Sequence, residues 1–206
     1  MHVPFVDLGA QHAPLKAALV AAWTELLHAN AFVGGAAVEA FEQQFAAACE
    51  APHAVGVSSG TDALVLILRA LGVGPGDEVI VPANTFIATA AAVSQVGATP
   101  RFVDAQAGTW NVDPGSVAAA VGPRTVGVLG VHLYGQPFDV DAVAAVCARH
   151  GLWLVEDACQ AHLARYKGRA VGTLGVAAAF SFYPSKNLGA PGDAGAVVTA
   201  DPALAR

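Results

Sequence analysis

The chain has few charged residues, few cysteines and no long apolar run. Lysine, arginine, aspartate and glutamate together make up 13% of the 206 residues, whereas hydrophobic residues make up 55%. Intrinsic disorder requires the opposite composition, so we expect a folded chain with a sizeable core. No stretch approaches the roughly 20 apolar residues of a membrane-spanning helix. The N-terminus also lacks a basic segment followed by an apolar one, so we expect no signal peptide.

The cysteines and the net charge exclude further classes of protein. Cys49, Cys147 and Cys159 are scattered and odd in number, which argues against a disulfide framework or a zinc site and fits a cytoplasmic location. The seven histidines form no metal-ligand pattern. A net charge of −6 argues against binding nucleic acid through a basic face. This net charge does not exclude a phosphate-binding site, because backbone amides can bind phosphate.

Apolar strands and amphipathic helices alternate along most of the chain. This alternation indicates an α/β fold in which a mostly parallel sheet is covered by helices on both faces. Sheets of this kind bind ligands at the carboxyl ends of their strands. The expected helices cover 12–29, 37–50, 62–71, 85–96, 114–121 and 139–150, and the expected strands cover 55–57, 78–81, 101–103, 125–132, 153–156, 176–182 and 194–199.

Two acidic residues and a small polar loop follow expected strands. The loop Ser58–Thr61 precedes a helix, so its amides and the helix dipole favour an anion, although a plain helix cap is an alternative. Glu156 and Asp157 end an apolar strand. Adjacent strand residues face opposite sides, so both point into one pocket only if the strand has already ended. An ordinary acidic strand end is the alternative here.

Lys186 differs in its surroundings from the other two lysines. Lys16 falls in an expected helix, and Lys167 falls in Tyr-Lys-Gly-Arg, which is typical of a solvated hairpin turn. Lys186 follows an apolar strand and precedes a glycine-rich stretch, where a lysine can act as a nucleophile or form an imine. A surface lysine in a loop is the alternative. A lysine, an acid and an anion site in separate segments match what pyridoxal phosphate (PLP) requires.

Five ordered segments resemble one known family. The sequence is similar to the nucleotide-sugar aminotransferases, the DegT-type PLP enzymes with the aspartate-aminotransferase fold. These segments cover nearly the whole chain: FVGGAAVEAFEQQFA, SSGTDALVLILRALGVGPGDEVIVPANTFIATAAAV, VHLYGQPFDVDAV, VEDACQAHLARYKGRAVGTLG and FSFYPSKNLGAPGDAGAVVT.

The resemblance implies two catalytic residues. Lys186 would bind the cofactor covalently and later move a proton between substrate and cofactor. Asp157 would hold the pyridine nitrogen protonated, which makes the ring an electron sink. A minority of the family dehydrates sugars with histidine in place of the lysine, and Lys186 argues against that activity.

The resemblance also implies the remaining cofactor contacts. Gln160 would contact the 3-hydroxyl of the cofactor, and Phe86 and Cys159 would lie against the two ring faces. The phosphate would be bound by three further residues, Gly60, Thr61 and Ser181. Leu163 stands where the family usually has glycine, and Pro191 and Ala194 interrupt a stretch that is usually richer in glycine.

The resemblance further implies how the chain is organised and what it does. Residues 1–206 would form the PLP-binding large domain, with an N-terminal arm over about 1–35, in an N-terminal fragment that lacks the small domain. The whole protein would be a cytoplasmic homodimer that transfers an amino group, with glutamate as the expected donor, to a keto group of a nucleotide-linked sugar. No nucleic-acid or membrane partner is expected. At the C-terminal end, Pro202 could open a further helix.

Two rival functions come from other classes. A non-catalytic regulatory or binding protein could keep the same fold. A dinucleotide-binding oxidoreductase would need a glycine-rich turn between a strand and a helix. The segment Gly72–Gly76 follows a helix and precedes a strand, so it predicts a tight turn instead.

Overall fold

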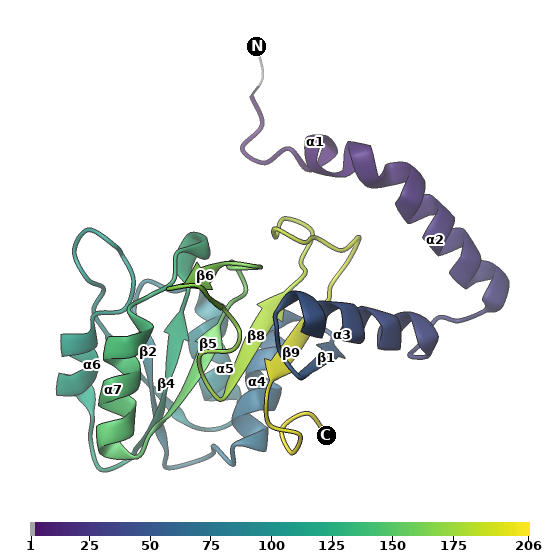
Figure 1. Cartoon of the computed structure of the whole chain (residues 1–206). Helices are drawn as coiled ribbons and strands as arrows, with labels where there is room; N and C mark the ends of the chain where they lie inside the picture. The colour runs from purple at the N-terminus through teal and green to yellow at the C-terminus, as the bar shows by residue number, and fades with distance from the viewer. Residues whose placement is uncertain (1–2) are drawn as a thin grey trace. The chain divides into compact units, whose positions relative to one another are not determined.

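The computed structural model of the protein describes residues 3–206 (Figure 1). The chain divides into two compact units, of which the first ends at Phe41 and the second covers Glu42–Arg206. The sequence predicts one helix over 12–29. In the structure a short 3-10 turn that contains Pro14 comes first, and a longer helix follows it and ends at Asn30, whose backbone is left-handed. The first unit contains α1 (Leu8–His12), the turn Ala13–Leu15, α2 (Lys16–Ala29) and the start of α3 (Ala36–Ala48).

The second unit contains the sheet and four further α-helices. The bounds of the helices and of the seven strands of the large sheet agree with the expected elements to within a few residues. The helices are α4 (Gly60–Ala70), α5 (Ile87–Gln95), α6 (Pro114–Ala120) and α7 (Val140–His150), and the strands are β1 (His53–Val57), β2 (Glu78–Pro82), β3 (Thr99–Val103), β4 (Thr125–Val131), β5 (Trp153–Asp157), β6 (Arg165–Tyr166), β7 (Arg169–Ala170), β8 (Ala177–Ser181) and β9 (Gly195–Thr199).

Seven of these strands form one mostly parallel sheet in the order β1-β9-β8-β5-β4-β2-β3. The pairs among β8, β5, β4, β2 and β3 are parallel, and β9 runs antiparallel to both β8 and β1. The prediction that the strand at 194–199 joins the sheet beside 176–182 is confirmed. Because two antiparallel steps separate β1 from β8, these strands point the same way, and their carboxyl ends share one edge of the sheet.

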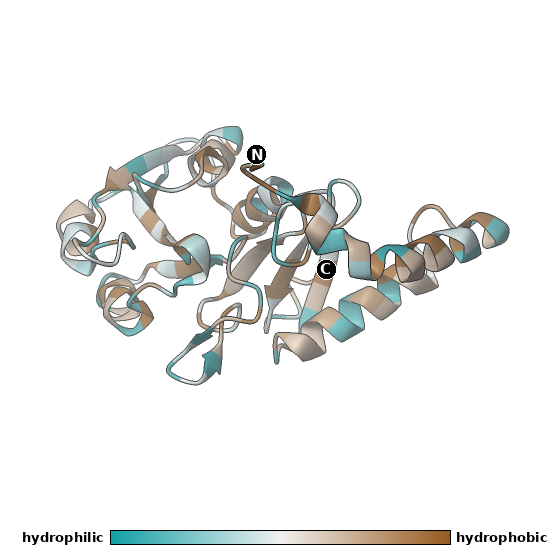
Figure 2. Cartoon of the chain, turned by 90° about the horizontal axis from the view of Figure 1, so that it is seen from above, coloured by the Kyte–Doolittle hydropathy of each residue, from teal (hydrophilic) through white to brown (hydrophobic). Residues whose placement is uncertain are grey.

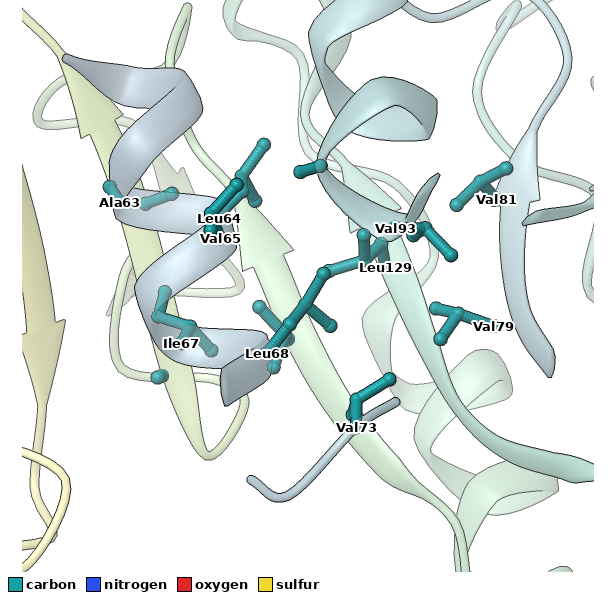
Figure 3. Packing of buried hydrophobic residues seen from close by; sticks show 14 of the residues in the cluster. Ala63, Leu64, Val65, Ile67, Leu68, Val73, Val79, Val81, Val93 and Leu129 are labelled. Atoms are coloured by element: carbon teal, nitrogen blue, oxygen red, sulfur yellow. The ribbon is translucent and has the colours of Figure 1, made fainter. Parts of the chain in front are cut away.

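Helices cover both faces of the sheet, as expected. Along β2, Val79 and Val81 pack with Leu64 and Leu68 of α4, in a cluster that also includes residues of α5 (Figure 3). Ile80, between them, belongs to a second cluster built with residues of α6 and α7. This alternation follows from the two-residue period of a strand. It explains why these strands read as continuous apolar runs, since both faces are buried.

Two segments outside the large sheet bear on the expectations. Lys167 lies at the turn of the β6–β7 hairpin, as predicted, and the hydrophilic residues of this hairpin are visible in Figure 2. No helix begins at Pro202, so that expectation is wrong. The chain from Pro202 to Ala205 instead forms turns, in which the side chain of Asp201 accepts a hydrogen bond from the amide of Ala203 and its carbonyl accepts one from the amide of Ala205. Among residues 3–206, no helix combines the length and the apolarity that crossing a bilayer requires.

We predict that Leu68→Ala destabilises the whole protein by about 3 kcal/mol, because it removes a fully buried side chain from the cluster under α4. Leu66→Ala on the same helix is the matched control, since Leu66 is 45% exposed. Its expected effect is below about 1 kcal/mol. Denaturant unfolding monitored by circular dichroism measures both. Equal losses in the two variants would contradict the assignment of this helix face to the core.

Candidate active site

The carboxyl ends of β1, β5 and β8 surround one cavity of about 300 Å³. Thr61, Asp157 and Lys186 were predicted to lie on one side of the sheet, and all three line this cavity, in agreement with that prediction. The structure therefore brings together predicted site residues that lie up to 126 positions apart in the chain (186 − 60). All eight predicted site residues line this cavity: Gly60, Thr61, Phe86, Asp157, Cys159, Gln160, Ser181 and Lys186.

The first turn of α4 forms one wall of the cavity. Ser59 caps the helix, because its Oγ accepts a hydrogen bond from the amide of Asp62 at 3.0 Å. Ser58 and Ser59 both donate to the Asp62 carboxylate, and these hydrogen bonds hold the pKa of Asp62 below its ordinary value. The amides of Gly60 and Thr61 belong to the first turn, which has no acceptors within the helix. The helix cap and the potential anion site therefore coexist.

Gly60 is required where three segments approach one another. A Cβ atom at this position would lie 2.7 Å from both Cys159 Sγ and Ser181 Cβ. Any larger residue would push the start of α4 away from the ends of β5 and β8. The glycine thus brings the helix amides, the thiol and the Ser181 hydroxyl into one small region of the cavity.

Asp157 is 6% exposed and has both carboxylate oxygens in hydrogen bonds. Oδ2 accepts from Thr89 Oγ1 of α5 at 2.7 Å, and Oδ1 accepts from the amide of Cys159 at 3.2 Å. A carboxylate offers about four lone-pair positions, so Asp157 can still accept from a ligand. Thr89 was not predicted as a site residue, since nothing in the sequence links it to an aspartate 68 positions away.

The side chain of Gln160 has its orientation set by the backbone. Its Oε1 accepts a hydrogen bond from the amide of Tyr134 at 2.7 Å. Tyr134 has a left-handed backbone (φ 54°), which is uncommon for a non-glycine residue. Because the amide oxygen is already engaged, the Gln160 NH₂ group is the end that remains to donate into the cavity.

Lys186 is the described lysine that lines the cavity. It follows β8, and its amide donates to the carbonyl of Tyr183 at 2.8 Å, which tightens the turn after the strand. Lys167 instead forms an ion pair with Asp141 at 2.7 Å on the surface, and Lys16 is exposed at the start of α2. The surroundings of the three lysines therefore differ in the way their sequence contexts predict.

Two further cavity residues present apolar or neutral groups. Phe86 precedes α5 and is 66% exposed, so its ring is available to a ligand. Burial, followed by the nearby charge of Asp157, raises the pKa of the Cys159 thiol well above its ordinary value. The thiol therefore stays protonated at neutral pH and is a packing group here, because the nucleophilic form of cysteine is the thiolate.

Glu156 faces the opposite side of the sheet from Asp157 and is fully buried. Its Oε2 accepts from the amide of Gly172 at 2.8 Å and pairs with His132 Nε2 at 3.0 Å, and its Oε1 accepts from the amides of Leu174 and Gly175 at 2.7 and 2.8 Å. The strand includes both acids, so they do not share the pocket. Of the two acids at this strand end, Glu156 thus anchors backbone amides on one face of the sheet, and Asp157 lines the cavity on the other.

Leu163 has a left-handed backbone (φ 59°) and is 63% exposed. This conformation favours glycine, which is the residue expected here from the resemblance. The leucine therefore departs from that pattern at a position where the backbone retains the glycine-like turn.

The cavity fits a phosphorylated pyridine aldehyde. The helix amides at Gly60 and Thr61 suit a phosphate. A carboxylate, Asp157, and an amine, Lys186, suit a ring nitrogen and an aldehyde. Within residues 3–206 no group of three or more histidine, cysteine or acidic residues is arranged to bind a metal ion.

Comparison with known proteins gives one consistent match. The model of the DegT/DnrJ/EryC1/StrS aminotransferase family matches residues 14–206. The dTDP-3-amino-3,4,6-trideoxy-alpha-D-glucose transaminase of Streptomyces venezuelae is 55% identical over 203 residues, which are 98% of this chain and 54% of that protein. The erythromycin biosynthesis sensory transduction protein EryC1 of Saccharopolyspora erythraea is 55% identical over 205 residues, covering 100% of this chain and 56% of that protein.

Solved structures agree with these sequence relatives. The crystal structure of S. venezuelae DesV in complex with a ketimine intermediate has a TM-score of 0.95 and 55% identity, and the match covers 98% of this chain and 55% of that one. The structure of Bacillus subtilis NtdA with bound cofactor PMP has a TM-score of 0.90 and 36% identity, over 98% and 46% of the two chains. The chain thus spans about half the length of the proteins it matches.

We predict that Glu156→Gln destabilises the whole protein by about 3 kcal/mol, because the new NH₂ group would face N–H donors in a buried site. Glu25→Gln, at an exposed position of α2, is the control and should change stability by less than about 0.5 kcal/mol. Denaturant unfolding measures both variants. A Glu156→Gln protein as stable as the control would rule out the anchoring role of this carboxylate.

Proposed function

Because the chain belongs to the DegT/DnrJ/EryC1/StrS aminotransferase family, we propose that the whole protein is a PLP-dependent aminotransferase of nucleotide-linked sugars. It would take the amino group from an amino acid, with glutamate as the proposed donor, and pass it to a keto group of the sugar. The observation that carries this proposal is the common cavity lined by Lys186, Asp157 and the first turn of α4.

Each side chain of the cavity has a role in this proposal. When bound, PLP supplies an aldehyde that accepts the amino group and a ring that withdraws electrons from the bond being broken. Asp157 accepts a hydrogen bond from the protonated ring nitrogen, which keeps the proton there. Gln160 donates from its NH₂ group to the 3-oxygen, since its own oxygen is bound by Tyr134.

The remaining residues bind the phosphate and the ring. The amides of Gly60 and Thr61, with the hydroxyls of Thr61 and Ser181, would bind the phosphate. Phe86 would pack against one face of the ring, and the neutral thiol of Cys159 would pack against the other.

Lys186 has two tasks in the proposed reaction. Its Nζ would hold the cofactor covalently at the aldehyde carbon, with the aldehyde oxygen leaving as water. After an amino-acid donor had replaced it at that carbon, the amine of Lys186 would move a proton between substrate and cofactor. A lysine suits both tasks, because its long side chain ends in a compact amine that can lose its proton.

We also propose that the whole protein is a cytoplasmic homodimer. Ile87, Tyr183 and Leu188 are at least half exposed in and near the segments that bound the cavity, and a second subunit would bury such residues. The three cysteines are free, which fits a reducing compartment. The chain would be the large domain with an arm over about 1–35, and the additional length of the relatives would supply the small domain.

A regulatory protein without catalysis is a second candidate. It is favoured by the name of the 55% identical relative EryC1, which is called a sensory transduction protein. Lys186, Asp157 and Gln160 oppose it, because a binding protein has no need for a lysine that can bond the cofactor.

We predict that borohydride reduction of the PLP-loaded whole protein labels Lys186 with a phosphopyridoxyl group. The expected selectivity follows from the cavity, which contains Lys186, whereas Lys167 is engaged with Asp141. Peptide mapping by mass spectrometry locates the label. Lys186→Ala should lose both the label and the visible absorption band of the bound cofactor.

Lys186→Arg is the matched control for charge. It keeps a cation in the cavity but cannot form the covalent bond, so it should also be unlabelled and inactive. A label found mainly at Lys16 or Lys167, or full activity in Lys186→Arg, would overturn the proposal. A protein that is labelled at Lys186 but transfers no amino group to any keto-sugar would support the regulatory candidate.

A further inference from the structure

A hydrogen-bonded chain of two threonines leads from the cavity to the carboxylate of Asp157. Thr89 Oγ1 donates to Asp157 Oδ2 at 2.7 Å, and Thr85 Oγ1 lies 2.8 Å from Thr89 Oγ1. Thr89 is fully buried, whereas Thr85 lines the cavity. Thr89 lies in the first turn of α5, and Thr85 lies in the bend just before the N-cap residue of that helix, Phe86.

We propose that Thr89 is a positioning residue that orients the Asp157 carboxylate toward the ring nitrogen of the cofactor, with Thr85 as the outer member of the chain. This inference rests on the proposed function, since it assumes that a pyridine ring occupies the cavity.

The direction of the hydrogen bonds follows from the number of protons available. An ionised carboxylate can only accept, so the single hydroxyl proton of Thr89 must point at Asp157. Thr89 Oγ1 can then only accept from its other neighbour, and Thr85 must donate to it. Thr85 therefore offers only oxygen lone pairs to the cavity, and the chain runs in one direction from Thr85 to Asp157.

Two different elements hold the two carboxylate oxygens. Thr89 of α5 binds Oδ2, and the amide of Cys159, at the end of β5, binds Oδ1. The terminal torsion of an aspartate side chain is broad when nothing restrains it. With one donor on each oxygen, rotation of the carboxylate would break at least one hydrogen bond. Its free lone pairs are thereby held in a fixed direction.

The same helix start carries a second predicted contact to the ring. Phe86 precedes α5, and its carbonyl accepts from the amide of Thr89 at 3.1 Å. The residue proposed to pack on the ring face and the residue that orients Asp157 are thus three positions apart and joined by a backbone hydrogen bond. One short segment can therefore set both the plane of the ring and the direction of the carboxylate.

The test uses the whole protein loaded with PLP that carries ¹⁵N in its ring. In Thr89→Val, which keeps the shape but removes the hydroxyl, the ring-nitrogen resonance should move toward the position of the unprotonated ring. The rate of the amino-acid half-reaction should fall about tenfold, the scale expected for one lost hydrogen bond to a charged group. The KM for the donor should stay unchanged, because Thr89 is buried behind Asp157.

Thr89→Ser keeps the hydroxyl and should restore both the resonance and the rate to within about twofold of the parent protein. Ser94→Ala is the matched control for losing a hydroxyl from α5, since the Ser94 hydroxyl donates to a carbonyl of its own helix, that of Ala90, at 3.4 Å. It should leave both readings unchanged. A Thr89→Val protein with the parent resonance and rate would overturn the inference.

A double-mutant cycle keeps the inference testable if Thr89→Val folds poorly. Adding Thr89→Ala to Asp157→Asn should cause no further loss of rate, because the carboxylate that Thr89 orients is already gone. Losses that multiply would overturn the positioning role. Failure of the proposed function looks different, since the parent protein itself would then lack the label at Lys186 or transfer no amino group to any keto-sugar.

Discussion

The alternation of side chains along β5 determines how the rest of the site is arranged. Glu156 and Asp157 are neighbours in the chain, and the two-residue period of a strand turns them to opposite faces of the sheet. Glu156 faces the side of α6 and α7, where it collects three backbone amides and a histidine ring nitrogen. Asp157 faces α4 and α5, where it borders the cavity. Glu156 thereby holds the segment that leads into β8, and Asp157 is available to a ligand in the cavity.

Burial of both acids depends on hydrogen bonds from the surrounding chain. A buried carboxylate without donors would be costly, and here each oxygen of both side chains has at least one. Apart from the amide of Cys159, which is two positions after Asp157, the donors lie 16 to 68 positions away in the chain, so the site forms only when the sheet and both helix layers have assembled. The close packing of Gly60 against Cys159 and Ser181 adds a steric requirement of the same kind. The fold and the cavity are therefore specified together.

Much of this architecture can be predicted from the sequence, because periodic apolar segments reveal the elements and the layers. The apolar runs over β2, β4, β5, β8 and β9 predict buried strands. Ser58–Thr61 and Lys186 stand out because each is polar and follows a predicted strand, β1 and β8 respectively. The partners of Glu156 could not be predicted, since three of its four donors are backbone amides and carry no signal in residue type. The contact between Thr89 and Asp157 spans 68 positions and depends on the order of the strands. The helix expected at Pro202 is not formed, because the turns there contain one helix-type hydrogen bond, from the amide of Ala205 to the carbonyl of Asp201 at 3.2 Å, and a single such bond does not offset the cost of ordering a helical turn.

The central claim is that the ends of β1, β5 and β8 form a single site for one pyridoxal phosphate molecule. A crystal structure of the PLP-loaded whole protein tests it most directly. The account predicts electron density for the ring with its nitrogen against Asp157, its C4′ joined to Nζ of Lys186 and its phosphate at the amides of Gly60 and Thr61. A cofactor found in another cavity, or one in this cavity with its phosphate against Asp157, would contradict the account.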